Sequence, residues 1–182
     1  MKNAKRFAAA LLIVVLAAGL LSGCQDTLAQ AVRKVLGTGS QTEEEDTTRW
    51  AEATTDPLMI EGIADPSAKY DSAITNGRLN VVFNGIWSRK TSYFTAPNGA
   101  ITVTGCGTAE GVQRFKVAVW KKLDGGAEYV GESTYYIPTD GTNYRCTITG
   151  LDPAATYRLT ISYDSSRYYL YGLVQAEGAA AV

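Results

Sequence analysis

The sequence predicts an all-β protein in which two antiparallel sheets, with seven or eight strands between them, pack as a β-sandwich over residues 77–182. From Gly77 onward, apolar side chains recur at every second position, which is the period of a half-buried strand. Turn-forming residues interrupt this alternation roughly every 8–14 positions, as is typical of sandwiches and barrels. Of the 18 aromatic residues, which contribute most to a core, all but Phe7, Trp50 and Tyr70 also lie beyond Gly77.

Five segments place their apolar residues on one face of a strand. In chain order, the side chains expected to face the core are Leu79, Val81 and Phe83; Ile101 and Val103; Phe115, Val117 and Val119; Tyr144, Cys146 and Ile148; and Tyr157, Leu159, Ile161 and Tyr163. Further strands are expected near residues 91–94, 129–137 and 168–175. Good turn formers separate these segments, at 97–99, 124–126, 140–141 and 164–166.

The stretch TITGLDPAATYRLTI at 147–161 predicts a corner between two strands. Leu151 can fill the end of the sandwich, Pro153 stiffens the turn, and Tyr157 can bury its ring while its hydroxyl bonds to backbone across the corner. This stretch resembles the corner between the fifth and sixth strands of fibronectin type III domains, which implies an immunoglobulin-like sandwich. An eight-stranded jelly roll, as in many carbohydrate-binding modules, is the alternative architecture.

The first 23 residues have the layout of a secretory signal peptide. Three basic residues among the first six precede an apolar run of about fifteen residues, which is too short for a helix to cross a ~30 Å hydrocarbon core. The run ends in Leu21-Ser22-Gly23-Cys24, which resembles the lipobox of bacterial lipoproteins. The resemblance implies that the signal is removed before Cys24 and that the thiol of Cys24 is lipidated. The protein would then be exported and held on the outer face of a bacterial membrane.

Residues 24–76 are expected to link the lipid to the sandwich. Residues 25–76 hold ten acidic and four basic side chains, a net charge of −6, whereas residues 77–182 have a net charge of +2. The run from Thr38 to Thr55 is too polar to offset the entropy of ordering it, which predicts a flexible stalk. The apolar LMIEGIA stretch leaves open whether residues 57–76 belong to the linker or dock on the domain.

The composition excludes several classes of function. The sequence has no histidine, so Ser-His-Asp and Cys-His mechanisms and His-ligated metal sites are excluded. The carboxylates of the domain are scattered, and their spacing forms neither a calcium loop nor the acid pair of a glycosidase. We therefore expect no enzyme, no catalytic residue, no metal and no cofactor. A net charge of −1 also argues against nucleic acid as a partner.

Two cysteines lie in the predicted domain. In an exported chain, Cys106 and Cys146 could form a disulfide that closes a loop of about 40 residues. Cys146 shares the inward face with Tyr144 and Ile148, whereas Cys106 is out of phase with Val103 unless a neighbouring glycine forms a bulge. A buried, unpaired thiol is the alternative.

Several aromatic side chains fall on the wrong face for a core. If Val117 and Val119 face inward, Trp120 points outward, with Lys116 and Lys122 on the same face. One tyrosine of each doublet, 135–136 and 168–169, must also leave the core face. The candidate ligand-binding residues are Trp120, Tyr136, Tyr168, Tyr169, Tyr171, Lys116 and Lys122. Packing of residues 57–76 over these rings is the alternative explanation.

These observations predict a cell-surface lipoprotein whose sandwich binds a glycan, or a protein of the envelope or of a host, through exposed aromatic rings. A structural or assembly subunit of an envelope complex is the alternative function. A small hydrolase that uses carboxylates alone is the least favoured one.

Overall fold

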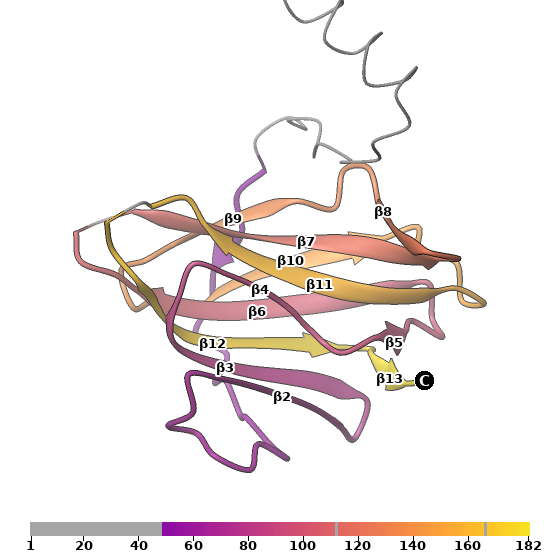
Figure 1. Ribbon diagram of the computed structural model, residues 1–182, viewed down its shortest axis with the longest axis horizontal. Coiled ribbons are helices and arrows are strands. Elements are labelled where there is room, and N and C mark those ends of the chain that lie inside the picture. Colours follow the sequence, from indigo (N-terminus) through magenta and orange to yellow (C-terminus); the bar gives the residue numbers. More distant parts are fainter. Residues whose placement is uncertain (1–48, 112, 166) are drawn as a thin grey trace, which may run out of the picture. The chain divides into compact units, whose positions relative to one another are not determined.

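The computed structural model describes residues 49–111, 113–165 and 167–182. Within these ranges the chain forms thirteen strands in two antiparallel sheets and no helix (Figure 1), which confirms the predicted fold class. None of the described segments is a helix that could span a membrane. The predicted signal peptide, residues 1–23, and the predicted lipidation site Cys24 lie outside the described residues.

The two sheets have six and seven strands. In spatial order, the six-stranded sheet contains β1 (Glu52–Ala53), β10 (Tyr144–Thr149), β6 (Ala100–Thr108), β12 (Leu170–Glu177), β3 (Arg78–Ile86) and β2 (Tyr70–Thr75). The seven-stranded sheet contains β13 (Ala180–Ala181), β5 (Phe94–Thr95), β11 (Thr156–Tyr163), β7 (Arg114–Leu123) and β8 (Gly126–Tyr129), with β4 (Ser88–Lys90) also paired to β11 and β9 (Tyr135–Pro138) to β7.

The paired strands are nested along the chain. β3 pairs with β12, β4 and β5 pair with β11, β6 pairs with β10, and β7 pairs with β8 and β9. This is the pairing of one long hairpin folded over into two sheets, which is a jelly-roll order. The strand order therefore follows the jelly-roll alternative of the sequence analysis within the predicted sandwich.

The core lies between the two sheets. Every side chain that the alternation assigned to the core is buried except Tyr144, which is half-buried against the same cluster. The expected strand near residues 91–94 is divided into β4 and β5, because residues 91–93 connect them outside the strands. The strand expected over 129–137 is divided into β8 and β9, because Ser133 N donates to Val130 O and closes a turn.

The corner between β10 and β11 has the predicted contacts. Leu151 and Tyr157 are buried. The Tyr157 hydroxyl accepts a hydrogen bond from Asp152 N at 2.7 Å and donates to Asp152 O at 3.3 Å. The ring therefore joins the start of β11 to the turn that precedes it, which fixes the exit of β10 relative to β11.

The six-stranded sheet begins well before residue 77. β1 and β2 form its two edges, so the chain between them has to cross the outer face of this sheet, a path that can be followed in Figure 1. Gln175 Nε2 donates to Met59 O at 2.6 Å, and Asn143 Nδ2 donates to Asp56 O at 2.9 Å. Residues 54–69 thus contact the sheet as a strap. Their acidic character, which suggested a linker, is used in part for an ion pair between Asp56 and Arg145.

Candidate functional site

The outer face of the seven-stranded sheet gathers cations and aromatic rings. Phe115, Val117 and Val119 of β7 face the core, so the alternate side chains of this strand point outward. The strand register sets the outward side chains of β4, β8, β9 and β11 beside them. We call this surface the basic aromatic face. It comprises Lys90, Arg114, Lys116, Trp120, Lys122, Tyr129, Tyr136 and Arg158, with Trp50 and Tyr93 from adjoining segments.

One cluster of this face surrounds Trp120, near the end of β7. Trp120 lies between Tyr129 and Arg158, its register partners on β8 and β11. The rings of Trp120 and Tyr129 meet edge to face with centroids 5.6 Å apart. Tyr93 accepts a hydrogen bond from Arg158 Nη1 at 3.2 Å, and Lys122 Nζ lies 5.1 Å from the centroid of the Tyr93 ring. The cluster thus holds two cations against one ring.

Two N–H groups of this cluster have no hydrogen-bond partner among the described residues. They are Trp120 Nε1 and Arg158 Nε, and both atoms are buried. They belong to directly opposed residues of β7 and β11. Because a buried donor without an acceptor costs about 1–3 kcal/mol, such pairs call for an explanation. An acceptor oxygen that reached the cluster after a side-chain shift would remove this cost.

A second cluster lies at the other end of β7. Arg114 Cζ stands 4.4 Å from the centroid of Tyr136 and 5.5 Å from that of Trp50, and the two rings are 5.8 Å apart. Trp50 is 48% exposed. With Gln113, Arg114, Pro138 and Asp164 it lines a hollow of about 550 Å³. An exposed indole beside a guanidinium, an amide and a carboxylate offers one ligand an apolar surface together with hydrogen-bond donors and acceptors.

The cations of the two outer faces differ in their partners. On the six-stranded sheet, Arg78 and Arg145 both form ion pairs with Glu177, at 3.3 and 3.4 Å, and Arg145 also pairs with Asp56. On the basic aromatic face, Arg114, Lys122 and Arg158 make ring contacts and no ion pair with a described residue. The two faces are therefore chemically distinct.

The sequence-predicted ligand residues separate into two groups. Trp120, Tyr136, Lys116 and Lys122 share the basic aromatic face. The other three are elsewhere: Tyr169 stacks on Trp87 with centroids 4.9 Å apart, Tyr168 packs against the core, and Tyr171 is exposed beside Asn84 on the six-stranded sheet. The seven residues therefore do not form one surface, because Tyr171 lies in β12 of the opposite sheet and Tyr168 and Tyr169 precede that strand. The strap covers the six-stranded sheet, not the Trp120 cluster.

Five residues of this face are not among the candidates that the sequence indicates: Arg114, Arg158, Tyr129, Trp50 and Tyr93. Arg114 had a usable signal, since it continues the outward positions of β7 that carry Lys116 and Trp120. Trp50 had none, because it belongs to the acidic stretch interpreted as a stalk. It reaches the site only because residues 49–51 run beside β9, where Tyr136 N donates to Arg49 O at 2.9 Å.

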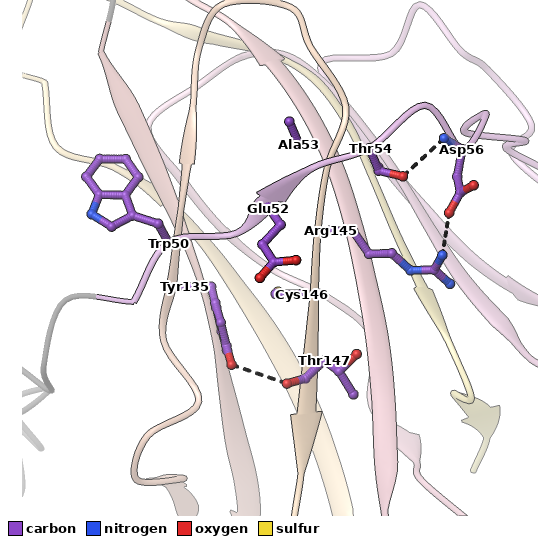
Figure 2. Close-up of a pocket in the computed structure, with 9 residues that line it drawn as sticks. All are labelled: Trp50, Glu52, Ala53, Thr54, Asp56, Tyr135, Arg145, Cys146 and Thr147. Carbon is purple, nitrogen blue, oxygen red and sulfur yellow. Dashed lines mark hydrogen bonds and ion pairs between the residues drawn. The ribbon is translucent and has the colours of Figure 1, made fainter.

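Another hollow, of about 430 Å³, lies where β1 meets β9 and β10 (Figure 2). In Figure 2 the Glu52 carboxylate points into it between Tyr135 and Arg145, whereas the Trp50 ring turns away. Arg145 is held by Asp56, and Tyr135 donates to Thr147 O at 3.3 Å. Within the described ranges no group of His, Cys, Asp and Glu gathers that could hold a metal ion. The contacts that line this hollow are internal to the protein. Its one cation among the described residues, Arg145, already has an acidic partner.

Cys106 and Cys146 are free thiols. The pairing of β6 with both neighbours is continuous, without a bulge, so Cys146 faces the core and Cys106 faces outward. A disulfide between them would have to pass through the sheet, so of the two alternatives left open by the sequence this fold has the unpaired thiols. Burial raises the pKa of Cys146 to about 12. Burial, and then the charge of Asp140, raise the pKa of Cys106, so neither thiol is prepared to act as a nucleophile.

Comparison with known proteins gives little. No family model matches the chain, and no curated protein matches it. Among solved structures, one from work titled "CBM4 structure and function" aligns with a TM-score of 0.32 and 10% sequence identity, over 60% of this chain and 73% of that one. A likeness at this level says nothing about a ligand.

Proposed function

We propose that this protein is a non-enzymatic binding module that is exported, anchored to the outer face of a bacterial membrane through a lipid on Cys24, and binds a glycan through the basic aromatic face. The anchor rests on the lipobox at 21–24. The binding role rests on the side chains of one sheet face, where aromatic rings and polar donors lie together.

The observation that carries the binding role is the pair of aromatic clusters at the two ends of β7. Arg114 and Trp120 are six positions apart in this strand, which corresponds to about 20 Å. An extended chain with flat, partly apolar rings and many hydroxyls could contact both clusters at once. Sugar rings have this character, since they stack on indole and phenol faces while their hydroxyls bond to the polar groups nearby.

We expect Trp50→Ala and Trp120→Ala each to weaken glycan binding by at least about tenfold, because exposed or partly buried aromatic anchors supply most of the energy at such sites. The measurement is affinity of the full-length protein, in non-ionic detergent, for immobilised chitin, xylan, β-1,3-glucan and purified bacterial cell-wall polysaccharide. Thermal unfolding of each variant separates lost binding from lost folding.

The matched control is Trp87→Ala. Trp87 has the same exposed fraction as Trp50, 48%, but its ring stacks on Tyr169, which is not part of the basic aromatic face. The Trp87→Ala variant should bind glycan with the affinity of the unmodified protein. If Trp87→Ala weakens binding and the other two folded variants do not, the basic aromatic face is not the site.

The anchor has its own test. Expressed in a bacterium that processes lipoproteins, the protein should enter the detergent phase on partitioning, with an N-terminal peptide that starts at Cys24 and carries the mass of the lipid. Cys24→Ser should lose this mass and keep the leader, whereas Cys106→Ser should behave as the unmodified protein. An unmodified Cys24 in a cytosolic protein would contradict the proposal.

A further inference from the structure

The strands of the basic aromatic face carry cations and no acidic side chain at their outward positions. The basic residues there are Lys90, Arg114, Lys116, Lys122 and Arg158. Carboxylates lie only at its margins among the described residues: Asp164 follows the end of β11 and lines the hollow beside Trp50, and Asp124 and Asp152 line a hollow with Lys122. A sheet face with only one sign of charge produces a potential that attracts ions of the opposite sign.

Three of these cations contact aromatic rings, and none of the three pairs with a carboxylate of the described residues. Arg114 lies against Tyr136 and Trp50, and Lys122 and Arg158 lie against Tyr93. A ring contact orients a cation and leaves its charge uncompensated, whereas an ion pair cancels it. On the opposite face, where the cations stabilise the fold, Arg78 and Arg145 both form ion pairs with Glu177. The ring-held cations are therefore oriented and still available to an anion.

From this contrast we infer that the ligand of the basic aromatic face is an acidic polysaccharide, one that bears carboxylate, phosphate or sulfate groups along its chain. This inference rests on the proposed glycan-binding function and specifies its ligand. Ring-held cations at both ends of β7 match charges spaced along a polymer, and the rings match the sugar units between them. The unpartnered N–H groups of Trp120 and Arg158 match an acceptor oxygen of the same polymer.

The charge of the rest of the chain separates this ligand from denser polyanions. Residues 25–76 carry a net charge of −6 and the whole chain −1. Nucleic acid and anionic bilayers present a continuous negative charge. This charge would attract the basic aromatic face but repel the acidic segment. A single acidic polysaccharide chain bears about one charge per sugar unit or fewer, less than duplex DNA bears over the same length. It can therefore engage the cations of one sheet and remain within the range of the face, since the Debye length is about 8 Å at physiological salt.

The test compares two polymers with the same sugar backbone, polygalacturonate and its methyl ester, in which the carboxylates are blocked. Binding of full-length protein in non-ionic detergent is measured at low and at high salt. We expect polygalacturonate to bind at least about tenfold more tightly at low salt, and the difference to shrink as salt rises. Lys122→Gln should weaken only the acidic polymer, about three- to fivefold, and Arg114→Gln with Lys122→Gln about 10- to 25-fold, because the two sites are far enough apart to act independently.

The control is Lys69→Gln, which removes the same charge next to β2 at the edge of the other sheet and should change neither affinity. Equal binding of the two polymers at low salt would overturn the acidic ligand and leave glycan binding standing. No binding to these polymers or to the neutral panel would overturn the glycan function itself. Equal or tighter binding to duplex DNA would also overturn the inference, because the face would then be a site for any polyanion.

Discussion

Gly172→Ala is expected to destabilise the protein by at least about 3 kcal/mol, which is exceptional for a change of one methyl group. Gly172 lies in β12, the strand at the centre of the six-stranded sheet between β6 and β3. Its φ of +151° is one that side-chain-bearing residues rarely adopt. A Cβ atom there would stand 2.1 Å from the carbonyl oxygen of Cys106 and 2.9 Å from Gly107 Cα. Both atoms belong to the backbone of β6, so the clash can be relieved only if β12 and β6 move apart.

Chemical denaturation of the full-length protein measures this loss. The matched control is Gly126→Ala on β8, where an added Cβ meets nothing within 4 Å and φ is not positive. The control should stay within about 0.5 kcal/mol of the unmodified protein. Equal stability of the two variants would mean that β12 and β6 approach less closely at this point than the backbone contacts indicate.

The alternation of the sequence predicts what lies between the sheets and, by the same rule, what points away from them. Val117 and Val119 fix the phase of β7, and that phase alone turns Trp120 outward. The corner at Tyr157 was also predictable, since its contacts are made within one turn of the chain. These features depend on local sequence, which is why they could be inferred without the tertiary structure.

Features that depend on pairing between distant segments could not be inferred. Nothing in the sequence around Tyr168 shows that β12 joins β3 and β6 in one sheet while β7 joins β11 in the other. The sequence therefore left open whether the candidate tyrosines share one surface, and Tyr136 and Tyr171 lie on opposite sheets. In the same way, the acidic stretch before residue 77 has the composition of a linker. Only its contacts with Arg145 and Gln175 show that it crosses a sheet.

Phe115→Ala is expected to cost about 3–5 kcal/mol, the range for removing a large, fully buried ring. Phe115 is 1% exposed and meets Phe83 of the opposite sheet at a centroid distance of 6.1 Å in an edge-to-face contact. Its ring occupies the space left by two glycines of β6: an added Cβ would stand 2.6 Å from the ring at Gly107 and 3.4 Å at Gly105. Without the ring, the two sheets would be separated by a cavity at this point.

Phe115 lies on the inner side of β7, and the outer side of this strand carries Arg114 and Lys116. The stability lost in Phe115→Ala therefore also measures how strongly the core supports the basic aromatic face. Leu123→Ala is the control on the same strand; Leu123 is 44% exposed and its truncation should cost less than about 0.5 kcal/mol.

Gly107→Ala should destabilise by about 1–3 kcal/mol through overpacking, and less in a Phe115→Leu background, because the smaller side chain leaves room for the added methyl group. Additive effects of Gly107→Ala and Phe115→Leu would show that the Phe115 ring does not fill the space beside the glycines of β6.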